Sequence, residues 1–151
     1  MAECEDVSRA NPTPVVFVYG TLQPGGYYWA THCEGRVCNV RPAQVRGTLY
    51  DLHVGYPGLR LEGDGWVQGC LLEVPKREDF ARIDQLEGFD PGRTEAENEY
   101  MRRRVPCFDL QGEPLGPAWT YEVSESVLSG YSGTVLELGV WSPDEPDASR
   151  C

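Results

Sequence analysis

The stretch that decides the fold is VVFVYG at residues 15–20, a run of β-branched and aromatic side chains that ends at a glycine. Such a run, bounded by turn-forming residues, is typical of a strand that is buried on both faces. The polar segment Asn11-Pro12-Thr13-Pro14 precedes it. The sequence therefore predicts a buried strand over 15–19 that leads at Gly20 into a loop.

Further strand-like segments follow along the chain. They lie at 37–40, 45–52 and 66–74. Pro42 and two glycine-containing turns, at 55–59 and 63–65, separate these segments, because proline and glycine interrupt regular strand pairing. The first two thirds of the chain are therefore predicted to be mostly β.

The hydrophobic period changes between Lys76 and Gly88. Phe80, Ile83 and Leu86 recur at helical spacing, and neither Gly nor Pro interrupts them. This pattern predicts one helix that ends at a Gly88 cap.

Two more strand-like segments, 100–108 and 118–123, flank a turn at 111–114, which is typical of a β-hairpin. Many short strands together with one clear helix predict an α+β fold, a small mixed β-barrel with flanking helices. A length of 151 residues suits one domain. We expect a polar N-terminal lead at 1–13, a single domain at 14–141, and an acidic, poorly ordered tail at 142–151.

The net charge of −11 is unevenly distributed: residues 15–104 sum to only −2, and the remaining −9 lies in the flanks. The overall acidity excludes nucleic acid as a partner, since like charges repel. The nearly balanced middle leaves room for an anionic or zwitterionic small molecule. No run of about 18 apolar residues is present, so no membrane partner is expected. A monomer is the default expectation.

The cysteines give a prediction of compartment. Cys4, Cys33, Cys38, Cys70, Cys107 and Cys151 contain no C-x-x-C pair. Free thiols are therefore expected rather than a disulfide framework, and with His32 and His53 as the only histidines no metal site is expected. The acidic N-terminus has no export signal. These features predict a reducing cytoplasm.

Helical geometry singles out Glu87. Each residue advances about 100° around a helix, so Glu87 lies about 20° from Phe80 and on the apolar face. A carboxylate turned toward the interior tends to have a raised pKa, which suits proton transfer near neutral pH. Two structural alternatives stay open, a Glu87 that turns to solvent and one that pairs with a strand arginine. Asp84 is expected to hold the helix or a neighbouring loop in place rather than to do chemistry.

Other polar residues are weaker candidates. Tyr121, in the last predicted strand, has a hydroxyl that would orient a substrate amine or Glu87, or would simply bond to backbone as a buried tyrosine. The arginines with the charge to hold a carboxylate are Arg36, Arg41, Arg46 and Arg60. Strand alternation places Arg103 on the face opposite Arg102 and Arg104, which argues against a nucleic-acid patch.

Four segments, in this order, resemble the γ-glutamylcyclotransferase-like family in its AIG2-like branch. They are VFVYGTL at 16–22, YPGL at 56–59, IDQLEG at 83–88, and Tyr100-x-Arg102 at the start of a strand. The resemblance covers roughly residues 14–123 and implies a small β-barrel with flanking helices, which agrees with the pattern of elements.

The resemblance also implies roles for individual residues. A loop whose backbone amides hold the glutamyl part of the substrate would be formed by Tyr19, Gly20, Thr21 and Leu22. Glu87 would be the catalytic acid/base. The loop has a physical rationale, because Gly20 lets backbone approach a ligand closely and successive N–H groups suit a carboxylate or an oxyanion.

The implied reaction converts a γ-glutamyl amide, whether of an amine, a dipeptide or an acylated metabolite, to 5-oxoproline and a free amine, without metal or cofactor. A non-catalytic small-molecule binding barrel of the same fold is the alternative, and a protein-interaction module that uses the acidic tail is a further one. The sequence departs from the family in a long acidic segment at 90–99, in the extra residues before the first strand, and in the aromatic loop at 27–29.

Overall fold

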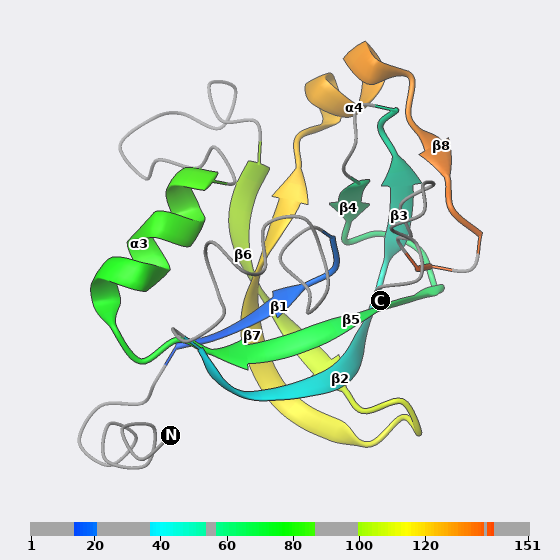
Figure 1. Cartoon of the computed structure of the whole chain (residues 1–151). Helices are drawn as coiled ribbons and strands as arrows, with labels where there is room; N and C mark the ends of the chain where they lie inside the picture. The colour runs from blue at the N-terminus through cyan, green and yellow to red at the C-terminus, as the bar shows by residue number, and fades with distance from the viewer. Residues whose placement is uncertain (1–13, 21–36, 54–56, 87–99, 138, 141–151) are drawn as a thin grey trace, which may run out of the picture.

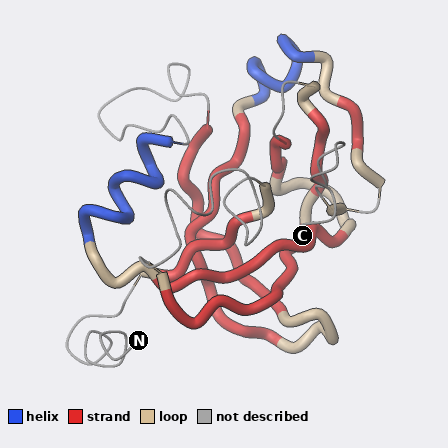
Figure 2. Tube along the Cα trace, viewed as in Figure 1, coloured by secondary structure: helices blue, strands red, loops and turns tan. Residues whose placement is uncertain are grey.

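The computed structural model describes residues 14–20, 37–53, 57–86, 100–137 and 139–140. Its strands are β1 (Val15–Val18), β2 (Cys38–Arg46), β3 (Thr48–Asp51), β4 (Pro57–Arg60), β5 (Trp66–Glu73), β6 (Tyr100–Phe108), β7 (Pro114–Val123) and β8 (Thr134–Val135). Its helices are α3 (Arg77–Leu86) and α4 (Glu125–Tyr131). Strands dominate the described chain, and the two helices lie at its periphery (Figure 1, Figure 2).

Five strands close into a barrel. The sheet order is β1-β5-β2-β6-β7-β4-β3-β8, and β1 pairs in addition with β7. This closing contact is parallel and sets Val16 opposite Trp119. The ring β1-β5-β2-β6-β7 has no free edge along this seam. The predicted small mixed β-barrel with flanking helices is thereby confirmed (Figure 1).

The strand β7 changes neighbours along its length. It pairs with β1 at Trp119 and then with β4, again in parallel, where Glu122 lies opposite Leu59. Beyond β4 the sheet continues antiparallel through β3 to β8. The end of β1 meets the start of β4, because a Cβ atom built on Gly20 would lie 2.8 Å from Cδ of Pro57. Chain ends of several strands thus gather at one end of the barrel.

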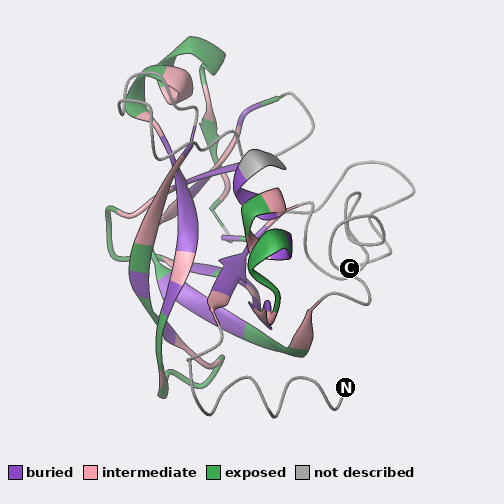
Figure 3. Cartoon of the chain, turned by 90° about the vertical axis from the view of Figure 1, so that its left-hand side faces the viewer, coloured by how far each residue is buried: buried purple, intermediate pink, exposed green. Residues whose placement is uncertain are grey.

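The first strand is buried on both faces, as its continuous apolar run predicts. Val16 and Val18 belong to a core cluster that also contains Ile83 of α3. Phe17 and Tyr19 point the other way, into a cluster to which all five barrel strands contribute. In Figure 3 the buried residues are concentrated along the barrel strands. The core is therefore double, with one part inside the barrel and one part under α3.

The helix α3 lies within the segment predicted at 76–88. Of its apolar residues, Ile83 is fully buried and Phe80 is half-buried. The short helix α4 was not predicted. Ser124 caps it, since its hydroxyl accepts a hydrogen bond from the Val127 N–H at 3.2 Å. Small and polar residues within ESVLSGY hide the helical signal, because the apolar spacing is too short to reveal a period.

Two predictions about strand boundaries were wrong. The strand β2 runs through Pro42, which pairs with Cys70 of β5. Among the described residues, Gln44 is the one residue of β2 that pairs with β6. Within that part of the chain, the half of β2 that holds Pro42 pairs with β5 alone, and a proline is tolerated at such an edge. The predicted strand 45–52 is also divided, because the chain bends at Gly47 between β2 and β3, where the Gly47 N–H bonds to the Gly65 carbonyl at 3.0 Å.

The strand β4 lies in the segment 55–59, which is predicted from the sequence to be a turn. The sequence does not predict this strand, because it contains Pro57 and Gly58, and both residue types usually end strands. Gly58 has a packing reason, because a Cβ atom there would lie 2.9 Å from Cγ1 of Val123. A close approach between two strands therefore explains this glycine.

The expectation of free thiols holds at two positions and fails at a third. Cys70 and Cys107 are free. Cys38 is disulfide-bonded. The absence of a C-x-x-C pair thus did not exclude a disulfide. The predicted N-terminal lead and acidic tail also lie outside the described residues.

Candidate active site

The end of β1 is tied to β7 through Tyr19. Its side chain is buried, and its hydroxyl donates a hydrogen bond to the backbone carbonyl of Tyr121 at 2.5 Å. The next residue, Gly20, packs against Pro57. These contacts fix the point at which the chain leaves the barrel and enters the loop predicted to hold a substrate.

Tyr121 connects the same point to the helix α3. Its hydroxyl donates a hydrogen bond to Oδ1 of Asp84 at 2.5 Å, and the side chain is almost fully buried. Asp84 lies in the last turn of α3, which ends at Leu86. The loop end at Tyr19 and the end of α3 are thus joined through one residue of β7.

Asp84 has a second partner. Nη1 of Arg102 lies 2.6 Å from its other carboxylate oxygen, and the two side chains are 23% and 13% exposed. The guanidinium of Arg102 also lies 5.2 Å from the centre of the Phe80 ring and 5.1 Å from that of Trp119. Both oxygens of Asp84 therefore accept hydrogen bonds, one from β7 and one from β6.

Burial and the neighbouring donors have opposite effects on the pKa of Asp84. Removal from water raises the pKa of this carboxyl, while the Tyr121 hydroxyl and the Arg102 charge oppose the rise, and the pKa stays above its ordinary value. Through these contacts Asp84 attaches the last turn of α3 to β6 and β7, which agrees with its expected role of holding the helix in place.

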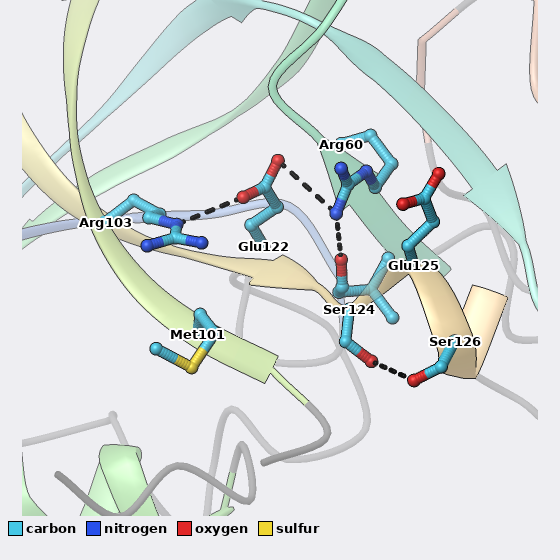
Figure 4. Close-up of a pocket in the computed structure, with 8 residues that line it drawn as sticks. Arg60, Met101, Arg103, Glu122, Ser124, Glu125 and Ser126 are labelled. Carbon is cyan, nitrogen blue, oxygen red and sulfur yellow. Dashed lines mark hydrogen bonds and ion pairs between the residues drawn. The ribbon is translucent and has the colours of Figure 1, made fainter. Parts of the chain in front are cut away.

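A cavity of about 400 Å³ opens near the ends of β4, β6 and β7. It is lined by Arg60, Met101, Arg103, Glu122, Val123, Ser124, Glu125 and Ser126. Glu122 lies between the two arginines, with Oε1 at 3.1 Å from Nε of Arg103 and Oε2 at 3.7 Å from Nη1 of Arg60 (Figure 4). Both signs of charge and two serine hydroxyls line this space, which suits a polar or zwitterionic molecule better than an apolar one.

Of the three predicted carboxylate clamps that the structure describes, Arg60 lines this cavity. Burial lowers its pKa, but the hydrogen bond to Glu62 and the charge of Glu122 raise it, and the net direction is upward. Arg46 instead lies over the ring of Trp66, and Arg41 lines a separate cavity near Asn39. Arg36 lies outside the described residues.

The structure brings together three of the predicted site residues. Tyr19, Gly20 and Tyr121 lie at one end of the barrel and are linked by the contacts given above. Thr21, Leu22 and Glu87 lie outside the described residues, as does the aromatic loop at 27–29. The substrate-binding and catalytic roles of these residues stay predictions.

Two features of the site were not predicted from the sequence. Arg102 is the charge partner of Asp84, and Tyr100 donates its hydroxyl to the Pro57 carbonyl at 2.7 Å. Strand alternation gave the only available signal, since it placed Arg102 and Arg103 on opposite faces. That alternation is confirmed, because Arg103 bonds to Glu122 instead.

Within the described residues no group of three or more His, Cys, Asp or Glu side chains is placed to hold a metal ion. Neither described helix has the length and apolar character that a membrane crossing requires.

Comparison with known proteins gives a family. A family model described as gamma-glutamyl cyclotransferase, AIG2-like, matches residues 16–143. A curated protein of Niallia circulans, named gamma-L-glutamyl-butirosin B gamma-glutamyl cyclotransferase, is 39% identical over 109 residues. The matched segment is 72% of this chain and 65% of that protein, so the chain spans less than two thirds of this relative.

Solved structures agree on the fold. An AIG2-like protein from Mus musculus has a TM-score of 0.62 at 17% identity, covering 89% of this chain and 91% of that one. A protein specific to uropathogenic E. coli has a TM-score of 0.60 at 16% identity, covering 85% and 92%. Identities this low speak for the fold alone, whereas the match over residues 16–143 speaks for the family. The chain belongs to the gamma-glutamyl cyclotransferase, AIG2-like family.

Proposed function

We propose that this chain is a γ-glutamylcyclotransferase that needs no cofactor and converts a γ-glutamyl amide to 5-oxoproline and a free amine. The α-amine of the glutamyl group attacks its own γ-carbonyl carbon. A C–N bond closes the five-membered ring, and the original amide C–N bond breaks. Because nucleophile and electrophile belong to one molecule, the enzyme acts mainly by folding the substrate into an attack geometry.

Glu87 is the proposed acid/base of this reaction. As a carboxylate it takes a proton from the α-ammonium group, and it gives this proton to the departing nitrogen. The ring nitrogen loses a second proton as the lactam forms, and this proton converts the released amine to its ammonium form, so the proton balance closes without another donor. Backbone N–H groups of the loop formed by Tyr19, Gly20, Thr21 and Leu22 would stabilise the oxyanion of the tetrahedral intermediate.

One observation carries the proposal. The hydrogen bonds Tyr19 to Tyr121 and Tyr121 to Asp84 join the start of the predicted substrate loop to the last turn of α3. Glu87 follows directly after the last residue of that helix, Leu86. The contacts among described residues thus support a site in which the loop and Glu87 act together.

The substrate class is a γ-glutamyl compound with a polar leaving amine. The Niallia circulans relative is named for a γ-glutamyl-acylated metabolite, which makes such an acylated amine a candidate beside γ-glutamyl dipeptides and simple γ-glutamyl amines. The cavity between Arg60 and Arg103, with its mixed charge, supports a polar leaving group. A cytoplasmic location and a monomeric state stay predictions from the sequence.

The test measures 5-oxoproline released by the purified chain from γ-glutamyl dipeptides, γ-glutamyl amines and γ-L-glutamyl-butirosin B. We expect release from at least one class, and a loss of about 10²- to 10⁴-fold in kcat for Glu87→Gln. Glu113→Gln, an exposed position in the hairpin turn, is the matched control and should retain full activity. Full activity in Glu87→Gln would remove this residue from the mechanism. Binding of all three classes without release would favour the non-catalytic barrel.

A further inference from the structure

Tyr121 has a single hydroxyl hydrogen, and the structure shows where it goes. The hydroxyl donates to Oδ1 of Asp84 at 2.5 Å, which is a short distance for a hydrogen bond between a hydroxyl and a carboxylate. A phenol that has given its only hydrogen to one partner can meet any other group only as an acceptor. Asp84 therefore determines the polarity of the Tyr121 oxygen.

Arg102 keeps Asp84 in the orientation that this polarity requires. Its Nη1 donates to the second carboxylate oxygen of Asp84 at 2.6 Å, and its guanidinium lies over the rings of Phe80 and Trp119, at 5.2 and 5.1 Å from their centres. Because an arginine is always a donor, the oxygen that faces it must accept. The carboxylate cannot rotate away from Tyr121 without losing this ion pair.

The same three side chains connect three elements of the fold. Asp84 comes from the last turn of α3, Arg102 from β6 and Tyr121 from β7. Tyr121 also accepts, at its backbone carbonyl, the hydroxyl of Tyr19. A change at Asp84 therefore reaches both the end of α3 and the start of the predicted substrate loop.

We propose that Asp84 is a positioning residue of the cyclotransferase site, which acts through Tyr121: it takes the Tyr121 hydrogen and so presents the phenol oxygen as a fixed acceptor toward N–H donors. The inference rests on the proposed function. In that reaction the N–H donor is the α-ammonium group of the glutamyl part. The α-carboxylate of the same part is itself an acceptor, so the Tyr121 oxygen would repel it. Asp84 itself touches neither substrate nor reacting atoms.

The experiment is a double-mutant cycle on kcat/KM with Asp84→Asn and Tyr121→Phe. An asparagine has the same shape, but its amide can donate to the phenol oxygen and release the tyrosine hydrogen. If Asp84 acts through Tyr121, each single variant loses about 10- to 100-fold in kcat/KM. The kcat/KM of the double variant then stays within about 2-fold of that of the less active single variant. Additive losses, or full activity in Asp84→Asn, would overturn the inference.

Asp79→Asn is the matched control. It makes the same chemical change at another buried aspartate of α3, in the first turn rather than the last. Its effect on kcat/KM should be small and additive with Tyr121→Phe. If Asp79→Asn were coupled to Tyr121→Phe in kcat/KM as strongly as Asp84→Asn is, the role of Asp84 would be reduced to general support of the helix.

A second readout tests the acceptor directly, with L-glutamate and glutarate as competitive inhibitors that differ only in the ammonium group. The wild-type chain should prefer glutamate, and the preference should fall by about 10-fold in Tyr121→Phe, which removes one charge-assisted hydrogen bond. Tyr121→Phe keeps the ring and its packing, so this arm works even where Asp84→Asn fails to fold. An unchanged preference would contradict the acceptor role.

The two proposals fail in different ways. A wild-type chain that releases no 5-oxoproline from any of the three substrate classes overturns the proposed function, and this inference with it. A wild-type chain that turns over normally while the Asp84 and Tyr121 effects are additive overturns the inference alone.

Discussion

Arg102 and Asp84 face each other across the boundary between β6 and α3, with Nη1 of the arginine 2.6 Å from a carboxylate oxygen of the aspartate. Both side chains are largely withdrawn from water. Removing one partner of such a pair leaves the other charge without compensation, which is a larger loss than the net value of the pair itself. The contact is therefore a sensitive point for the attachment of the helix.

Arg102→Met should lower the free energy of unfolding by about 2–4 kcal/mol, since it removes the ion pair of Asp84 and the cation that lies over the Phe80 and Trp119 rings. Urea denaturation followed by circular dichroism measures this. Arg104→Met is the control, because Arg104 is exposed and also lies over the Trp119 ring, at 5.0 Å, so its loss should be below about 1 kcal/mol. Equal losses in the two variants would contradict the assigned importance of the ion pair.

The titration of Asp84 gives a pH dependence with a definite sign. Its pKa is raised in the folded chain, first by burial, so the folded state holds this proton more tightly than the unfolded state does. The stability that Asp84 contributes is complete below its unfolded pKa and is lost as the pH rises through its folded pKa. Asp84→Asn cannot titrate. The free energy of unfolding of the wild type, relative to that of Asp84→Asn, should therefore decrease as the pH rises above about 4.

Urea denaturation of the two proteins at intervals between pH 4 and pH 8 measures this difference. Ser129→Ala, an exposed and non-titrating change, serves as the control and should show a constant difference from the wild type. A relative stability of the wild type that grows with pH would mean that the Arg102 charge outweighs burial and that the folded pKa is depressed.

Much of the barrel could be predicted because local pattern and tertiary burial agree there. The run at 15–19 is apolar at every position, and the structure buries alternate residues in two different clusters. The hairpin of β6 and β7 was visible for the same reason, since its strands keep their pairing from Tyr100 to Phe108. The elements that could not be predicted from the sequence are those that depend on pairing between distant strands. β4 contains Pro57 and Gly58 and exists because β3 and β7 pair with it on both sides.

The site was predictable in its parts but not in its connections. Helical phase pointed to the apolar side of α3, and the buried Ile83 and Asp84 lie on that side. No local pattern could show that Asp84 meets Tyr121, because the two residues are 37 positions apart and are brought together by the path of β7. The role of a buried carboxyl depends on such partners, which is why Asp84 was read only as a support for its helix.

Glu122 should be the most stability-determining acid around the cavity. It is buried between Arg60 and Arg103, and one of its oxygens also accepts the Leu61 N–H at 2.9 Å. Glu122→Ala should lower the free energy of unfolding by about 3–5 kcal/mol, because Arg60 and Arg103 each lose an ion pair and the Leu61 N–H loses its acceptor. Glu62→Gln is the control, since Glu62 also pairs with Arg60 but is 61% exposed, and its loss should stay below about 1 kcal/mol. Similar losses in thermal or urea unfolding would contradict the effect of burial.

Cys107 should resist alkylation in the native state. The thiol is buried in the barrel core, and burial raises its pKa to about 12. Since the thiolate is the reactive form, iodoacetamide at pH 8 should modify Cys107 on the order of 10³-fold more slowly in the folded chain than in urea. Mass spectrometry of the peptide that contains Cys107 measures the rate. Native modification at the rate of an exposed thiol would contradict the packing of β6 in the core.

Gly20 gives the most direct test of the loop geometry. A methyl group at this position would lie 2.8 Å from Cδ and 3.0 Å from Cγ of Pro57, so Gly20→Ala must shift either the backbone at Gly20 or Pro57, where β1 enters the predicted substrate loop. If loop amides bind the glutamyl part, a displacement approaching 1 Å should lower kcat/KM by about 10- to 100-fold, with stability reduced far less than for a core substitution.

Gly130→Ala is the matched control for that change. Gly130 lies in α4, and nothing lies within 4 Å of the added carbon. The helix gains a better helix former, so this variant should be more stable by about 0.5–1 kcal/mol and equally active. Turnover assays and urea denaturation on both variants separate the two effects. Unchanged kcat/KM in Gly20→Ala would argue that the backbone at Gly20 does not approach the substrate, and it would move the oxyanion contacts elsewhere in the loop.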